Sequence, residues 1–326
     1  MLTERSNIAM PAPPQSQTEM VTIPNVICLG HEPAVATAPN TSLKPTTQQV
    51  ASKEETQLNF NLSPSCMLAP VLQVKHYTKT LFSLVVTKPT GMVFRTGEHA
   101  MIGLIINGKP VFRPYFICSP SSSGSLEFYS AKIPYGALTS FLHKSSTLNS
   151  IIIDINPIGS LLLSALAPGE RLLLFCAGVA IGPAVSILSE PEVYRTFKQV
   201  IIVQTCRQVD GFQYLKEKIA QLKSNPSLKA LAKGKARIYT STTRERSPFM
   251  GRIQHLITSG KLTSDLGGRP LNANDRFMVC GPQAMVTDVT TVLTAMGYKE
   301  GSVSNPQAFV CESVVATTET NQVSLA

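Results

Sequence analysis

The sequence lacks any run of about 18 consecutive apolar residues, a length that could span a bilayer as a helix. It has no C-x-x-C pair and no histidine-rich segment, so its seven scattered cysteines indicate neither a zinc site nor a disulfide framework. Charged residues are scarce, at 15% of 326 residues, whereas hydrophobic residues reach 43%, as in soluble globular proteins. These features exclude an integral membrane protein, predict no metal ion and favour a reducing cytoplasm.

Residues 1–66 show no sustained apolar period and are rich in Pro, Thr, Ser, Gln and Ala, which predicts a disordered tail. Prolines interrupt the first 20 residues, and Glu4 and Glu19 are acidic, so neither a secretory peptide nor an organelle presequence is indicated. The tail holds three basic and five acidic residues, so the remainder carries a net charge of +11, against +9 for the whole chain. We predict that this basic remainder forms two domains, 67–168 and 169–326.

The first of these domains has the pattern of short strands separated by turns. Asn107-Gly108 is the residue pair that a tight type I′ hairpin requires. A short helix is expected between Gly136 and His143, and Pro168-Gly169 marks the end of the domain. The pattern predicts a small antiparallel sheet or barrel with strands at Leu81–Thr87, Ala100–Ile106, Val111–Ile117, Leu126–Ile133 and Ser150–Ile155.

The second domain begins with Leu172–Phe175, which is too uniformly apolar for a strand with one wet face and suits a parallel sheet covered on both sides. Small residues follow, and a helix begins near Pro183. Backbone N–H groups in such a loop can approach a phosphate at a helix start, although small residues also occur where a helix packs closely on a strand. The spacing is not the three-glycine dinucleotide fingerprint. The small residues are Ala177, Gly178, Ala180 and Gly182.

Strands and helices alternate through the rest of the chain, which predicts a doubly wound α/β domain with a parallel sheet. Gln199–Thr205 and Arg276–Cys280 have the pattern of buried strands. Two helices are predicted from apolar faces, in which the methionines are interpreted as core filler. These faces are Phe212, Leu215, Ile219 and Leu222, then Met285, Val289, Val292, Leu293 and Met296.

Four motifs occur in order on these predicted elements. They are RPYFICSP (Arg113–Pro120), CAGVAIGP (Cys176–Pro183), CGPQAM (Cys280–Met285) and FVCE (Phe309–Glu312). Together with the domain order, they make residues 71–316 resemble the ferredoxin-NADP reductase family, most closely its bacterial type. The resemblance implies an FAD-binding β-barrel domain, an NADP-binding α/β domain, and a C-terminal segment that returns to the flavin.

For FAD, the resemblance implies that Arg113 binds the pyrophosphate and that Tyr115 packs on the flavin ring, with Ser119 in the same segment. A guanidinium fork suits phosphate oxygens, and a phenol offers flat apolar area. The alternative is an exposed strand arginine beside a core tyrosine. The resemblance adds backbone contacts to the pyrophosphate from Ile133, Gly136, Leu138 and Thr139. Thr139 also suits an ordinary helix N-cap.

For NADP, the resemblance implies a pyrophosphate seat at Gly178, Ala180 and Gly182, with the nicotinamide near Cys280 and Gly281. A buried strand residue is the alternative for Cys280, because free cysteine is commonly buried. The three arginines of the family that bind the 2′-phosphate match Arg207, Arg244 and Arg252, and their fixed charge favours NADP over NAD. Each of them alone would be an ordinary surface residue.

Two positions depart from the family pattern. Phe116 replaces the serine expected beside flavin N5, and it can neither donate a hydrogen bond nor relay a proton. Val315 replaces the aromatic residue expected over the flavin. The ring of Phe116 could compensate for the missing aromatic ring. The resemblance therefore predicts a reacting centre at Phe116, Cys280 and Glu312, with Val315 beside the cofactor.

Three functions are consistent with the sequence. The first is an FAD-dependent reductase between NADPH and ferredoxin or flavodoxin, acting as a monomer without nucleic acid. It is favoured because a basic chain attracts an acidic carrier and because no iron–sulfur cysteine spacing is present. The second is an NADPH-dependent reductase of free flavin or of an oxygenase component. The third is a nonenzymatic nucleotide-binding relative, and the departures at Phe116 and Val315 are consistent with it.

Overall fold

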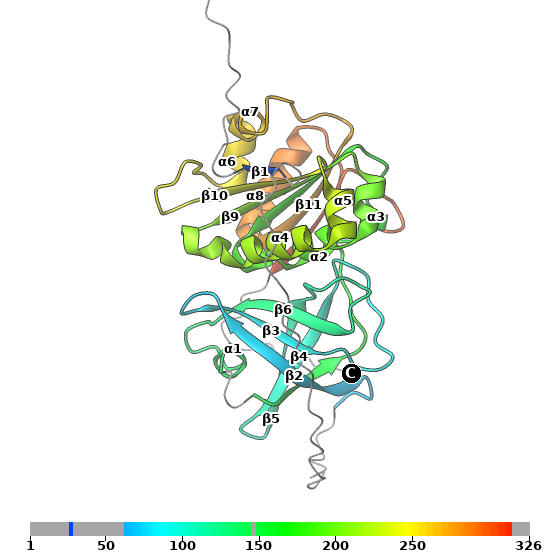
Figure 1. Cartoon of the computed structure of the whole chain (residues 1–326), viewed down its shortest axis with the longest axis vertical. Helices are drawn as coiled ribbons and strands as arrows, with labels where there is room; N and C mark the ends of the chain where they lie inside the picture. The colour runs from blue at the N-terminus through cyan, green and yellow to red at the C-terminus, as the bar shows by residue number, and fades with distance from the viewer. Residues whose placement is uncertain (1–25, 29–61, 145–147, 315–326) are drawn as a thin grey trace, which may run out of the picture.

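The computed structural model describes residues 26–28, 62–144 and 148–314, which form two stacked domains (Figure 1). The first domain is a curled antiparallel sheet in the order β5-β4-β7-β2-β3-β6, so β5 and β6 are its two ends. This confirms the predicted antiparallel domain, although the strand Cys66–His76 was not among those predicted. The elements are β2 Cys66–His76, β3 Leu81–Thr87, β4 His99–Ile106, β5 Lys109–Phe116, β6 Ser125–Ala131, α1 Thr139–Leu142 and β7 Ser150–Asp154.

The β4–β5 hairpin turns at Asn107-Gly108, as predicted. Asn107 has φ 49° and Gly108 has φ 73°, the left-handed values that a type I′ turn needs at both central residues. The two-residue turn sets the register of the ladder, so Ile106 pairs with Lys109 and His99 pairs with Phe116. Inside the sheet, Phe82 and other apolar side chains form a core of their own.

The second domain is a sheet in the order β1-β10-β9-β8-β11-β12. Five of these strands are parallel, and β1 Val26–Cys28 pairs antiparallel with β10 at the edge. The parallel strands are β8 Arg171–Ala177, β9 Gln199–Cys206, β10 Ala236–Thr242, β11 Asp275–Pro282 and β12 Phe309–Val314. The helices are α2 Gly182–Leu188, α3 Pro191–Thr196, α4 Gln213–Ser224, α5 Pro226–Ala232, α6 Ile253–Thr258, α7 Lys261–Asp265 and α8 Gln283–Ala295.

Strand β8 is buried on both faces, which explains its continuous apolar run. Leu172 and Leu174 pack in a cluster with α2 and α4, whereas Leu173 and Phe175 pack in a second cluster with α6 and α8. Alternate side chains thus enter opposite layers, as the two-fold period of a strand requires. The doubly wound arrangement is confirmed.

Three features differ from the sequence predictions. Val26–Cys28, within the predicted disordered tail, form strand β1. Thr139 is the first residue of α1 and not its cap, which is Leu138; the Thr139 Oγ1 accepts a hydrogen bond from the Ile133 N–H at 3.1 Å. The prediction that the methionines fill the core holds only for Met285, which packs against the cluster of α6 and α8 and also lines a cleft, whereas Met296 follows α8 and is 47% exposed. The core face of α8 is instead Val286, Val289 and Leu293.

The two domains share one hydrophobic cluster. Cys118 and Tyr129 of the first domain pack in the same cluster as α2 and α4 of the second. Tyr129 stacks on Tyr214 of α4 with ring centroids 4.0 Å apart. Glu190, which precedes α3, accepts hydrogen bonds from Thr96 Oγ1 and the Ser121 N–H, both at 2.7 Å. These contacts fix the space between the domains. No helix in the described part of the chain has the length and apolarity needed to cross a bilayer.

Candidate functional site

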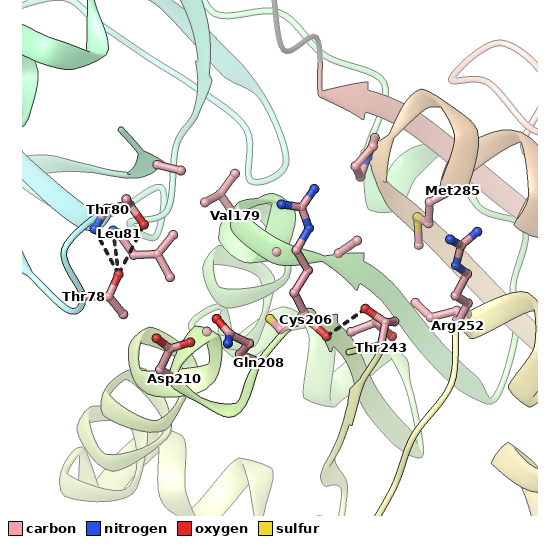
Figure 2. Close-up of a pocket in the computed structure, with 18 of the residues that line it drawn as sticks. Thr78, Thr80, Leu81, Val179, Cys206, Gln208, Asp210, Thr243, Arg252 and Met285 are labelled. Atoms are coloured by element: carbon pink, nitrogen blue, oxygen red, sulfur yellow. Dashed lines mark hydrogen bonds between the residues drawn. The ribbon is translucent and has the colours of Figure 1, made fainter. Parts of the chain in front are cut away.

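A cleft of about 860 Å³ lies between the two domains. Its lining combines the β2–β3 turn and the end of β6 with the carboxyl ends of β8, β9 and β11 and the start of α6. Figure 2 shows Thr78, Thr80 and Leu81 on one side, and Gln208, Thr243 and Arg252 on the other. The carboxyl edge of a parallel sheet is where α/β domains bind nucleotides, and the volume suits such a ligand.

The small residues of the loop after β8 have two different roles. Gly178 lines the cleft with φ 56°, and a Cβ built on it would meet nothing within 4 Å, so its backbone is open to a ligand. Ala180 is buried. A Cβ on Gly182 would lie 2.8 Å from Cys118 Sγ and 3.5 Å from Phe116 Cβ. Gly182 therefore lets the first domain approach α2, and of these two glycines only Gly178 has open space beside it.

The three predicted arginines line the cleft or the hollow beside it. Arg207 and Arg252 line it, and Arg207 and Arg244 share an adjoining hollow of about 460 Å³. The Arg244 N–H donates to the Arg207 carbonyl at 3.1 Å, which ties the two loops together. The carboxylate of the neighbouring Glu245 accepts a hydrogen bond from the backbone N–H of Val209 at 2.7 Å. None of the three guanidinium groups forms an ion pair with a described residue.

A buried amide also lacks a partner in the cleft. Gln254 donates from Nε2 to Asp288 at 2.7 Å, but its buried Oε1 has no hydrogen-bond partner among the described residues. A ligand with a donor group would satisfy it. Together with the open backbone at Gly178 and the three guanidinium groups, this set fits a dinucleotide that carries an additional phosphate.

The residues predicted to hold FAD lie on the first domain, at the ends of its sheet. Arg113 and Tyr115 are on β5, outside the residues that line the cleft. Arg113 Nη1 donates to the Phe112 carbonyl at 2.7 Å, and the guanidinium keeps further donors. Burial raises the pKa of Tyr115, so its phenol stays protonated. Just after β5, the backbone N–H of Cys118 donates a hydrogen bond to the Glu127 carbonyl of β6 at 2.7 Å.

The loop from Ile133 to Thr139, which follows β6, is held by hydrogen bonds within itself. The Gly136 N–H donates to the Ile133 carbonyl at 3.0 Å, and Leu138 and Thr139 are buried. His143, just after α1, has a buried Nε2 without a partner among the described residues. The free donors of Arg113 and the unsatisfied nitrogen of His143 could each bind a polar group of a flavin nucleotide. Ser119 is buried: its Oγ accepts from the Glu127 N–H, and its carbonyl accepts from Ser186 Oγ at 2.7 Å, so it joins the domains.

The predicted reacting residues are brought together where the domains meet. Cys280 of β11 pairs in register with Glu312 of β12. Phe116 packs edge-on against His99, with ring centroids 5.7 Å apart, and His99 contacts Glu312. Gly281 is buried, and a Cβ on it would lie 2.5 Å from Met285 Sδ, so this glycine admits α8. Val315 lies outside the described residues. No cluster of three or more potential metal ligands occurs in the described ranges.

The charge states in this centre follow from burial and contact. Burial raises the pKa of Cys280 well above its ordinary value, so its thiol is neutral and a poor nucleophile. Burial also acts to raise the pKa of Glu312, but the contacts with His99 and Ser160 outweigh it and hold the pKa below its usual range. Glu312 is therefore a carboxylate at neutral pH. Sequence reasoning missed His99, Ser160 and Gln254, although the two-residue hairpin already places His99 opposite Phe116.

Comparisons with known proteins agree with this geometry. No protein-family model matches the chain. The flavodoxin/ferredoxin–NADP reductase of Rhodobacter capsulatus is 44% identical over 244 residues, 74% of this chain and 90% of that protein. The ferredoxin–NADP reductase of Azotobacter vinelandii is 35% identical over 230 residues, 70% of this chain and 89% of that protein. A ferredoxin NADP+ reductase from Neisseria gonorrhoeae, solved with bound FAD and NADP, has a TM-score of 0.69 at 24% identity, over 77% of this chain and 99% of that one.

Proposed function

The chain belongs to the ferredoxin–NADP reductase family, and from this premise we propose that it is an FAD-dependent oxidoreductase between NADPH and a one-electron carrier. The carrier is a ferredoxin or a flavodoxin, as the names of the relatives state for those proteins. The observation that carries the proposal is the cleft, which Gly178 and Arg207 line together with residues of the antiparallel first domain, here called the flavin-type domain. Arg244 lines the adjoining hollow, and its backbone N–H binds the Arg207 carbonyl. We further propose that the chain acts as a monomer in the cytoplasm.

The residues have distinct tasks in this reaction. Bound FAD supplies a centre that accepts a hydride and releases electrons singly. Arg113 and the Ile133–Thr139 loop bind its phosphates, and Tyr115 orients its ring. Gly178, with the three arginines, orients NADPH, and the 2′-phosphate is recognised by Arg207 and Arg244. Cys280, packed between neighbouring strands, keeps the site dry, which makes precise positioning of the two rings effective.

The test is the behaviour of the purified full-length chain. We expect it to bind FAD, to show flavin absorbance, and to lose that absorbance under anaerobic NADPH. Electrons should then pass to ferredoxin or flavodoxin. A colourless chain without affinity for FAD would contradict the proposal and favour a nonenzymatic nucleotide-binding protein. Faster transfer to free flavin than to either carrier would favour a flavin reductase.

A further inference from the structure

His99 occupies a position that no role has yet explained. It stands directly opposite Phe116 in the β4–β5 ladder, with its ring at 85° to the phenyl ring and the centroids 5.7 Å apart. Its Nδ1 lies 2.8 Å from Glu312 Oε1, and both side chains are only 17% and 15% exposed. An imidazole from the flavin-type domain therefore meets a carboxylate from the last strand of the α/β domain, next to the residue that replaces the expected serine.

The carboxylate is held in place from its other side. Glu312 Oε2 accepts hydrogen bonds from the Ser160 N–H at 2.7 Å and from Ser160 Oγ at 2.8 Å. The Ser160 segment is fixed to β4, because the backbones of His99 and Ile158 exchange hydrogen bonds at 2.8 and 3.0 Å. A Cβ on Gly159 would lie 3.0 Å from Glu98 Cα and 3.4 Å from Glu312 Oε2, so this close approach needs glycine. His99 and Glu312 thus form a built pair.

Among the ionisable side chains at this place, the His99 imidazole is the one suited to proton transfer. Glu312 is ionised, because its contacts hold its pKa low. Burial raises the pKa of Cys280 and of Cys311, so both thiols stay neutral. Glu98 is turned away and pairs with Arg95 at 2.7 Å. Imidazole is the side chain that gains and loses a proton near neutral pH, and a carboxylate on one ring nitrogen leaves the other for exchange.

We propose that His99 carries the reaction proton in this chain, with Glu312 as its positioning residue, in place of the hydroxyl that Phe116 lacks. The inference rests on the proposed function. Each NADPH that gives two electrons to two one-electron carriers leaves NADP+ and one proton. His99 takes up this proton at Nε2 and passes it to solvent. In the opposite direction it supplies one proton for each NADPH formed.

The experiment separates the two halves of the reaction in the full-length, FAD-loaded chain. His99→Gln keeps a polar side chain beside Glu312 but cannot carry a proton. His255→Gln removes an exposed imidazole from α6 and serves as the control. Stopped-flow absorbance follows reduction by NADPH and then reoxidation by ferricyanide, with and without added imidazole. FAD content and the thermal midpoint of the FAD-free protein are measured for both variants.

In His99→Gln we expect reoxidation to slow at least about tenfold, the lower side of what general acid–base groups contribute. Imidazole should restore much of the rate, while reduction by NADPH, FAD content and the thermal midpoint stay close to those of His255→Gln. Unchanged reoxidation without an imidazole response would overturn the proposal. Loss of FAD or a lowered midpoint would overturn it too, since His99 would then be structural. If the unaltered chain is not reduced by NADPH, the proposed function fails and takes this inference with it.

Discussion

Arg207 and Arg244 lie on separate loops, yet their positions are coupled. Two backbone N–H groups, from Arg244 and Glu245, donate to the Arg207 carbonyl at 3.1 and 3.2 Å. Glu245 is held by the Val209 N–H and so does not cancel the charge of either arginine. The two arginines line the same hollow and have no ion-pair partner among the described residues, which supports the proposal that they bind an anion.

Replacing Arg207 and Arg244 by alanine should therefore weaken NADPH use far more than NADH use. A charge-assisted hydrogen bond is worth about 1.5–3 kcal/mol, so each loss should cost roughly tenfold to a hundredfold in kcat/KM for NADPH. Steady-state kinetics with both cofactors measure this. Arg246→Ala is the matched control, because Arg246 is exposed on the same loop but lines neither hollow. Equal losses for NADPH and NADH would show that these arginines do not recognise the 2′-phosphate.

Glu312 should make the stability of the chain depend on pH. Its folded-state pKa is lower than the ordinary value of 4.5, so folding favours the ionised form. The stability that Glu312 contributes is fully present at pH values above its ordinary pKa. It is lost as the pH falls through the lower pKa of the folded state. Urea unfolding of the chain and of Glu312→Gln over a series of acid pH values should show the difference between them shrinking as the pH falls. A difference independent of pH would contradict this account.

At the scale of elements, a buried ion pair joins the starts of two central strands. Arg171 of β8 donates from Nε and Nη2 to the two carboxylate oxygens of Asp275 in β11, at 2.7 and 2.6 Å. The side chains are 4% and 0% exposed. Arg171 also donates to the carbonyls of Arg269 and Pro270, so it fixes the loop before β11. Such a pair contributes little over an apolar contact, but removing one partner leaves a buried charge.

Asp275→Asn should lower the free energy of unfolding by about 3–5 kcal/mol, the usual cost of breaking a buried pair by changing one partner. Urea denaturation measures it. Glu170→Gln is the comparison, because the Glu170–Lys198 pair is exposed and the change should have a much smaller effect. Similar losses for both variants would mean that burial does not set the strength of the Arg171–Asp275 pair.

The elements were largely predictable from sequence because local signals specify them. Leu172–Phe175 required a strand covered on both faces, and Asn107-Gly108 required the hairpin. Helix α8 shows where prediction from sequence ends, because its apolar side chains cover a wide arc of the helix surface. Only the packing against β11 and α6 determines that Val286 is buried and that Met296, just after the helix, is exposed. Gly178 and Gly182 are equally small in sequence, and only the approach of the other domain separates their roles.

The candidate site was predictable in part. The motifs contain Cys280 and Glu312, and the family resemblance indicated the three arginines. Arg207 and Arg244 follow strands β9 and β10, and Arg252 precedes α6. His99 and Ser160 belong to the same centre, but they reach Glu312 through the contact between domains. That contact joins residues more than 150 positions apart, and no periodicity or spacing records it. The assigned cofactor contacts of these residues stay predictions.

At the scale of the whole molecule, the two domains pack against each other, and the chain has a net charge of +9. The shared core, the Tyr129–Tyr214 stack and the Lys218–Glu127 ion pair at 2.5 Å hold the two halves of the cleft. These contacts join both domains and the cleft in one body with an excess of positive charge. Such a body attracts an acidic carrier over a distance set by the ionic strength.

Electron transfer to an acidic ferredoxin or flavodoxin should therefore slow steeply with added salt. The Debye length falls from about 30 Å at 0.01 M to about 3 Å at 1 M salt, which removes attraction beyond direct contact. We expect the second-order rate constant for reoxidation of the reduced chain to fall at least about tenfold over this range, within the usual span of electrostatic steering. A neutral quinone as the electron acceptor is the control, because its encounter with the protein involves no net charge. If the carrier and the quinone respond alike, the salt acts on the chain itself, and the positive charge does not guide the partner to it.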